Sequence, residues 1–170
     1  MVDKPFFVCY NMSIIIKIDA ERTCLMDNSK NFNNFKIGEV YLMKFNGTGN
    51  EQSGWRPGLI FQNNMGNAHS PNIIALPLTS SIKNEYMPTH VFLPASHTGL
   101  LKNSVVLCEN PERMSKTRIG AFLTTIPDRF MEEIAVASLL ASSAISYIDY
   151  TVLLSIWKRA KELNAVALRS

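Results

Sequence analysis

Two side chains near neighbouring strand ends, Arg56 and Thr79, are the strongest candidates for chemistry in this sequence of 170 residues. Arg56 lies in a Gly-Trp-Arg-Pro turn before the predicted strand Gly58–Asn63, and Thr79 ends the apolar run that starts at Asn72. An arginine stays charged at physiological pH and presents a planar fork of donors to two phosphate oxygens at once. Together with a nearby hydroxyl, such a cation is suited to binding a phosphodiester.

Each of these residues also has a structural interpretation. Arg56 could be a surface arginine paired with Glu39 or Glu51, and Thr79 could cap a short turn that begins just after it. Glu51 and Gln52 lie in a glycine-rich loop shortly before Arg56. A loop carboxylate is usually only solvated, but beside an arginine it could orient the guanidinium or accept a proton.

The sequence contains no signature of a metal or cofactor site. Its three cysteines, Cys9, Cys24 and Cys108, are widely separated and form no CxxC pair, which favours free thiols in a reducing cytosol over a zinc site. Walker, Rossmann and HExxH motifs are absent from the sequence. We therefore expect no cofactor and no bound metal. His90, at a predicted strand start, is expected to make a cross-strand hydrogen bond.

The composition is that of a globular protein, with 46% hydrophobic and 18% charged residues. The net charge is only +3 and the isoelectric point is about 8.8. Binding to nucleic acid through bulk charge would therefore be weak, so that any RNA contact has to be local.

Three regions follow from the pattern along the chain. Residues 1–35 are expected to form an N-terminal extension, in which a strand or hairpin over Phe6–Ile18 precedes an Asn-rich linker. The apolar part is too short and too interrupted to span a membrane. Residues 36–142 form the main domain, and residues 143–170 add a C-terminal amphipathic helix.

The main domain reads as a series of short strands followed by a helix. An irregular loop is predicted between the second and third strands, over Asn64–Pro71, and Pro77 is expected to restrict pairing of the third strand to an edge or terminus. Short strands with long loops favour a small, strongly curved antiparallel sheet or barrel. The predicted strands are Gly38–Phe45, Gly58–Asn63, Asn72–Leu78, Thr89–Leu93, Ser104–Cys108 and Ile119–Thr125.

The spacing of apolar residues changes to a helical one after Pro127. A break at Ser142-Ser143 separates this helix from a second one, whose apolar stripe is typical of a core or oligomer contact. Lys158, Lys161 and Glu162 are expected on its other side. The apolar positions are Phe130, Ile134, Ala137 and Ala141 in the first helix, and Tyr150, Leu153, Leu154, Trp157 and Ala160 in the second.

Read together, several stretches resemble the MazF/PemK family of toxin endoribonucleases from bacterial toxin–antitoxin pairs, in its order and at about its spacing over roughly residues 36–142. They are Gly38-Glu-Val-Tyr, Glu51-Gln-Ser-Gly-Trp-Arg-Pro57, Phe61-Gln-Asn-Asn-Met-Gly-Asn67, Ser70-Pro-Asn-Ile-Ile-Ala, Leu78-Thr79, Pro88-Thr-His-Val91 and Asn103-Ser-Val-Val-Leu. The resemblance implies a mainly β (α+β) fold, the SH3-like small barrel of the MazF/PemK/CcdB toxins with C-terminal helices.

The resemblance also implies an activity and its partners. It implies a cytoplasmic homodimer that is neutralised by a cognate antitoxin and cleaves single-stranded RNA without metal. The catalytic pair of the family corresponds to Arg56 and Thr79. Residues that correspond to its RNA-binding positions are Glu51, Gln52, Ser53, Ser80, Asn110 and Arg113.

The sequence departs from the family pattern in the segment Glu109–Arg113, where Asn110 replaces a glutamine, Pro111 is inserted, and Glu112 lies at the place of an arginine. This leaves two alternatives open. The protein could be a non-catalytic binding toxin on the same fold, like the gyrase poisons in which a C-terminal tryptophan matters, with Trp157 as the candidate here. It could also be a relative that has lost activity.

Overall fold

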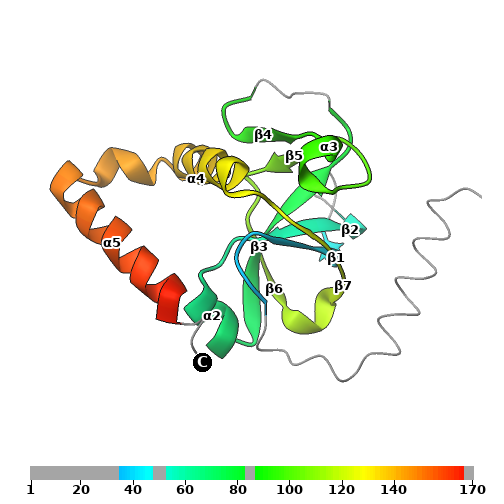
Figure 1. Ribbon diagram of the computed structural model, residues 1–170, viewed down its shortest axis with the longest axis horizontal. Coiled ribbons are helices and arrows are strands. Elements are labelled where there is room, and N and C mark those ends of the chain that lie inside the picture. The colour runs from blue at the N-terminus through cyan, green and yellow to red at the C-terminus, as the bar shows by residue number, and fades with distance from the viewer. Residues whose placement is uncertain (1–34, 48–52, 83–86, 167–170) are drawn as a thin grey trace, which may run out of the picture.

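The computed structural model describes residues 35–47, 53–82 and 87–166 (Figure 1). The N-terminal extension predicted for residues 1–35 therefore lies outside the described residues, apart from Phe35. The strands are β1 Glu39–Asn46, β2 Ser53–Ile60, β3 Asn72–Thr79, β4 His90–Leu93, β5 Ser104–Leu107, β6 Glu112–Ser115 and β7 Ile119–Thr125. The helices are α2 Asn64–His69, α3 Ala95–Thr98, α4 Asp128–Ser142 and α5 Tyr150–Val166, with 3-10 turns η1 Lys116–Arg118 and η2 Ala144–Tyr147.

Antiparallel pairing joins the seven described strands in the order β4-β5-β3-β2-β1-β7, and β6 also pairs with β3. Strand β3 is central because its two ends have different partners. Its first half, Asn72–Ala75, pairs with β6, whereas Leu78 and Thr79 pair with β5. The sheet is barrel-like without being closed (Figure 1), which confirms the predicted fold class.

Alternating side chains along the strands form two apolar clusters on opposite faces of the sheet. In β3, Ile73 and Ala75 point into one cluster, and Leu76 and Leu78 into the other. The cluster on the α4 side contains Val40, Leu59, Leu76, Leu78, Val91, Leu93, Leu100, Val106, Cys108, Ile126, Phe130, Ile134 and Ala137. The opposite cluster contains Phe35, Tyr41, Met43, Phe45, Ile60, Ile73, Ala75, Met114 and Ile119.

The segment predicted as an irregular loop over Asn64–Pro71 contains helix α2 instead, so this prediction was wrong. The Asn63 side chain accepts a hydrogen bond from the Gly66 amide at 2.8 Å and caps the helix. Asn67 is fully buried, and its side-chain amide donates to the Gln62 carbonyl at 3.0 Å. Polar residues that suggested a loop are therefore the ones that hold this short helix.

The Gly-Trp-Arg-Pro turn was also predicted wrongly, because Gly54–Pro57 belongs to β2 and pairs with β1. Gly54 has φ of 78°, a conformation that favours glycine, and remains paired with Phe45. The ladder between β2 and β3 begins only at the pair Gly58–Pro77. Pro57 and Pro77 thus lie at the end of the β2–β3 ladder, where a proline is tolerated because it has no amide hydrogen to donate to a neighbouring strand.

Helix α4 confirms its prediction, since Phe130, Ile134 and Ala137 are buried and α4 lies against β4 (Figure 1). It ends at Ser143, whose φ of 53° is left-handed. The predicted β7 is confirmed at both ends, whereas β6 was not foreseen. No helix in the described ranges is long and apolar enough to cross a membrane.

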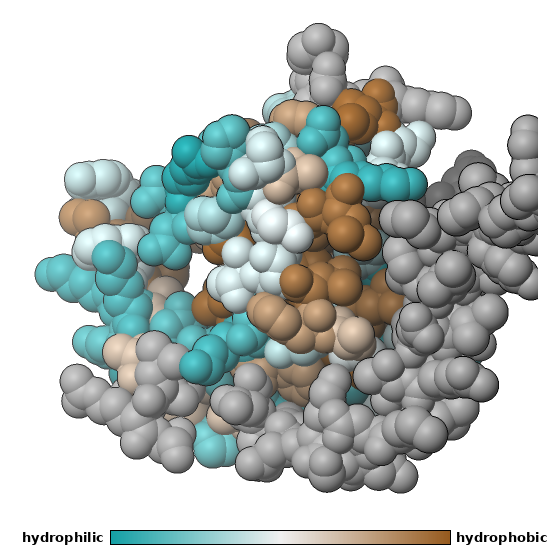
Figure 2. Space-filling model, turned by 45° about the vertical axis from the view of Figure 1, so that its right-hand side comes forward, coloured by the Kyte–Doolittle hydropathy of each residue, from teal (hydrophilic) through white to brown (hydrophobic). Residues whose placement is uncertain are grey.

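The predicted apolar stripe of α5 is largely exposed. Tyr150, Leu154 and Trp157 keep 70%, 44% and 55% of their surface exposed. Lys161 lies 4.2 Å above the Trp157 ring, on the stripe, so its predicted position on the opposite side was wrong. Exposed apolar side chains also occur on β7, and Figure 2 shows such side chains (brown) gathered in the middle of one face of the molecule, beside polar areas in teal.

Candidate active site

The register of the sheet relates Arg56 to Thr79. Gly58 of β2 pairs with Pro77 of β3. Arg56 lies two residues before Gly58, and Thr79 lies two residues after Pro77. Alternation along the strands places both side chains on one face of the sheet, and the same antiparallel register, if extended two residues past the ladder, would align them. That face is the one bearing Phe45 and Ile60. The β2–β3 ladder itself stops at Gly58 and Pro77, before it reaches either residue.

Arg56 is half-buried, and its guanidinium donates to the carbonyl of Ser53 from Nη2 at 2.7 Å and from Nε at 3.3 Å. Desolvation lowers the pKa of this guanidinium. Glu39 is not its partner, because that carboxylate accepts from the Tyr41 hydroxyl at 2.9 Å and from the Lys36 amide at 2.8 Å. The predicted surface pair with Glu39 is thus wrong, and the cation is held by a neutral carbonyl.

Close packing on both faces of β2 supports the backbone at Arg56. A Cβ on Gly58 would lie 2.6 Å from the Met43 sulfur and 3.0 Å from the Phe45 ring, so a larger residue would have to displace these side chains. On the other face, a Cβ on Gly120 would lie 3.1 Å from the Trp55 ring. Trp55 therefore rests on β7 across β1, which fixes the residue next to Arg56.

The Thr79 hydroxyl is half-exposed at the end of β3 and accepts a hydrogen bond from the Ser81 amide at 3.1 Å. The predicted capping interpretation is therefore confirmed. It does not compete with a role in binding, since a hydroxyl that accepts from a backbone amide can still donate its own hydrogen. Ser80, the next residue, is exposed.

The remaining predicted site residues are spread over the molecule. Glu51 and Gln52 lie outside the described residues. Ser53 starts β2, exposed, and Asn110 is exposed in the turn after β5. Arg113 is exposed on β6 opposite Ile74. Five residues of β3 separate that position from Thr79, about 16 Å along a strand. Side-chain alternation thus relates Arg56 to Thr79 on one face of the sheet, whereas Arg113 lies farther along β3.

Two ion pairs accompany the segment in which the sequence departs from the family. His90 Nε2 lies 3.0 Å from a Glu109 carboxylate oxygen, which confirms the predicted cross-strand bond of His90. Glu112 accepts from Arg118 at 2.8 Å, and Arg118 Nε also donates to the Lys44 carbonyl at 2.7 Å. Glu112 thus joins β6 to β1. Arg118 lies six residues after Glu112, and nothing in the sequence separates it from Arg113 and Lys116 as the partner of this carboxylate.

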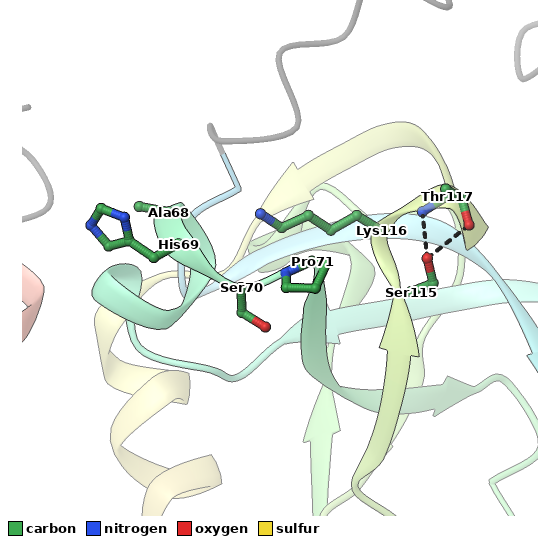
Figure 3. A pocket seen from close by; sticks show the side chains of 7 residues that line it. All are labelled: Ala68, His69, Ser70, Pro71, Ser115, Lys116 and Thr117. Carbon is green, nitrogen blue, oxygen red and sulfur yellow. Dashed lines mark hydrogen bonds between the residues drawn. The ribbon is translucent and has the colours of Figure 1, made fainter.

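A pocket of about 390 Å³ lies at the other end of β3 from Thr79 (Figure 3). It is lined by Ala68, His69, Ser70, Pro71, Ser115, Lys116 and Thr117. Lys116 is buried, and its amine already binds the Asn67 carbonyl near the end of α2, while burial lowers its pKa. Ser115 and Thr117 bind each other at 2.8 Å. This lysine therefore has a structural role, apart from the candidate pair.

In the part of the chain that the structure describes, no three residues among His, Cys, Asp and Glu are grouped to hold a metal ion. The family model for the PemK-like, MazF-like toxins of type II toxin–antitoxin systems matches residues 36–140. The chain belongs to this family. The match spans the seven strands that the structure describes and α4 as far as Leu140, and it ends before η2 and α5.

Individual relatives agree with this assignment. Endoribonuclease MazF of Staphylococcus saprophyticus is 39% identical over 98 residues, which are 57% of this chain and 82% of the relative. Endoribonuclease EndoA of Bacillus subtilis is 33% identical over 113 residues, covering 66% and 97%. A mycobacterial endoribonuclease solved in complex with its cognate antitoxin superposes with a TM-score of 0.55 and 26% identity, covering 65% of this chain and 96% of that one.

Proposed function

We propose that this toxin is a metal-independent endoribonuclease that cleaves single-stranded RNA, with Arg56 and Thr79 as its catalytic pair. The observation that supports the proposal is the register of β2 and β3, which, extended two residues past the pair Gly58–Pro77, would align the two side chains on one face of the sheet. The endoribonuclease names of its relatives support the reaction class.

In the proposed reaction, the 2′-oxygen of a ribose attacks the adjacent phosphorus and the bond from phosphorus to the 5′-oxygen breaks. The products are a 2′,3′-cyclic phosphate and a free 5′-hydroxyl. Negative charge grows on the non-bridging oxygens, where Arg56 would stabilise it and Thr79 would donate a hydrogen bond. One such preorganised donor contributes a factor of about 100 to 1,000 in rate. DNA lacks the attacking hydroxyl and should resist.

Arg56 acts in this scheme as a cation and not as the base. Desolvation lowers its pKa, yet arginine starts from a pKa above about 12 and stays charged at neutral pH. The proton of the 2′-hydroxyl therefore needs another acceptor. Glu51, five residues before Arg56, is the candidate base, and with Gln52 it would contribute to RNA binding.

Residues farther along the sheet would bind the flanking nucleotides. Ser53 and Ser80 lie next to the pair in sequence, while Asn110 and Arg113 lie beyond it. A single strand of RNA can span the roughly 16 Å to Arg113 in a few nucleotides, so its cation would bind a flanking phosphate. We also propose that the toxin acts in the cytoplasm as a homodimer and is neutralised by a cognate antitoxin.

The test is cleavage of a long single-stranded RNA by the purified protein in EDTA. Arg56→Ala should lower the rate about 100-fold or more, and Thr79→Val, which keeps the shape and removes the donor, should lower it by a similar factor. Thr79→Ser should retain most activity. Arg113→Ala is the matched control: it should raise the RNA concentration for half-maximal rate and leave the maximal rate nearly unchanged.

Products should carry a cyclic phosphate, and a DNA of the same sequence should stay intact. Equal rates for the wild type and Arg56→Ala would remove this assignment of the site. Intact RNA together with topoisomerase-dependent DNA breaks in expressing cells would instead establish the gyrase-poison alternative. Absence of both, with no growth arrest on induction, would identify an inactive relative.

A further inference from the structure

Helix α5 carries a broad apolar surface that the described part of the molecule does not cover. At 100° per residue, its large apolar residues occupy an arc of about 200°, within which Lys161 and Asn164 are the polar exceptions, and its other polar residues lie outside this arc. Leu153 is half-buried, but most of the arc is open. The large exposed side chains on it are Tyr150, Val152, Leu154, Ile156 and Trp157.

The exposed apolar face of α5 is expected to pack against another segment. A helix of 17 residues is only marginally stable in water by itself, and an amphipathic helix is normally held by burial of its apolar face. The contact of α5 with the body is made to α2 near its C-terminal end. There the Asn164 side chain accepts from the Asn64 amide at 3.0 Å. Figure 1 shows α5 (orange to red) running from η2 back to α2.

Asn64 also marks the place where the N-terminal part of the chain joins the body. Its side-chain oxygen accepts from the Ile37 amide at 2.8 Å, while its own amide donates to Asn164. Asn64 thus contacts both the entry of the N-terminal residues and the end of α5. Residues 19–34 can extend to about 50 Å, and α5 is about 26 Å long. Any segment before residue 19 can therefore reach the whole helix.

The sequence supplies a fitting segment. Phe6–Ile18 contains one charged residue, Lys17, and is otherwise dominated by large apolar side chains. Exposure of both this run and the α5 arc to water would be costly, and mutual burial removes both costs. We propose that Phe6–Ile18 docks in cis on the apolar arc of α5, so that the two segments outside the region matched by the family model cover each other.

Hydrogen–deuterium exchange on the full chain tests this docking. Amides of α5 should exchange at least about tenfold more slowly in the full chain than after deletion of residues 1–18, while amides of β5 stay unchanged and report that the body is folded. Ile15→Asp, a single change within the run, should reproduce the loss of protection if the deletion variant does not fold, and Asn11→Asp should not.

Two neighbouring residues of α5 give a matched pair. Ile156→Asp places a charge on the apolar arc and should abolish the protection of α5, whereas Ser155→Asp introduces the same residue 100° away, on the polar side, and should preserve it. Equal exchange of α5 in the full chain and the deletion variant would overturn the proposal. So would protection that disappears on dilution in both proteins, because a second copy would then be the cover.

Discussion

Helices α4 and α5 follow each other in the chain and have the same helical spacing of apolar residues, yet they have different surroundings. Helix α4, of 15 residues, buries Phe130, Ile134 and Ala137 in the cluster beneath β4. Helix α5, of 17 residues, leaves Leu154 and Trp157 about half exposed and contacts the body mainly through α2. Periodicity thus specifies that a segment is an amphipathic helix, but the partner of its apolar face depends on where the preceding turn directs it.

The two helices should differ most in how much one of their apolar side chains contributes to the free energy of unfolding. Ile134→Ala on α4 should lower the free energy of unfolding by about 2–5 kcal/mol, because Ile134 is fully buried and its removal leaves a cavity. Leu154→Ala on α5 should change it by less than about 0.5 kcal/mol in a protein that lacks residues 1–18. Urea unfolding measures both. Similar losses for the two variants would show that α5 has a cover within the remaining chain.

A second contrast concerns access to the core beneath α4. Burial raises the pKa of the Cys108 thiol to about 11, so its thiolate fraction at pH 8 is roughly 100-fold lower than that of an ordinary cysteine. In a variant with Cys9 and Cys24 replaced by serine, alkylation of Cys108 should be slower than in the unfolded chain by at least that factor.

The same thiol makes stability depend on pH. Because the pKa is raised in the folded state, the protonated thiol favours folding below the unfolded pKa near 9.0, and this contribution is lost as the pH rises toward 11. Replacement of Cys108 by alanine should flatten this dependence of stability on pH.

The alkylation experiment has its own control on α5. Leu154→Ala should leave the alkylation rate of Cys108 unchanged, and acceleration by that variant would mean that α5 also protects the core.

A smaller effect than that of Ile134→Ala is expected where α5 meets α2. Asn164→Ala removes the acceptor for the buried Asn64 amide at the start of α2 and should cost about 1 kcal/mol. Hydrogen exchange should show faster exchange over the C-terminal turns of α5. Asn164→Asp keeps an oxygen at the same place and should behave like the wild type. If Asn164→Ala leaves exchange of α5 unchanged, this contact does not hold the helix.

The main parts of the fold could be predicted from local patterns. The apolar runs of β1 and β3 and the helical apolar spacing of α4 follow directly from the sequence, because each pattern extends over several residues. Helix α2 could not, because its asparagines are typical of loops and become helix caps only through contacts with Gly66 and Gln62. Strand β6 was missed for a related reason: it pairs with β3 across a long separation in sequence.

The features of the candidate site likewise divide into those that the sequence predicts and those that depend on strand pairing. Arg56 and Thr79 stood out by residue type and position, and family resemblance gave them roles. That Arg113 lies toward the opposite end of β3, and that Glu112 binds Arg118, depended on how β6 pairs. A charged residue on a short strand carries no signal of its partner, since ion pairs form between side chains of any separation in sequence.

The sequence by itself determined the family, the chemical character of Arg56 and Thr79, and which segments are apolar, because these are properties of residue types and their local spacing. Only the tertiary structure decided that β2 pairs with β3 in a register that puts the two catalytic candidates on one face of the sheet, and that α4 is buried while α5 is exposed. Registers and burial arise from contacts between residues far apart in the chain, and no local pattern specifies such contacts.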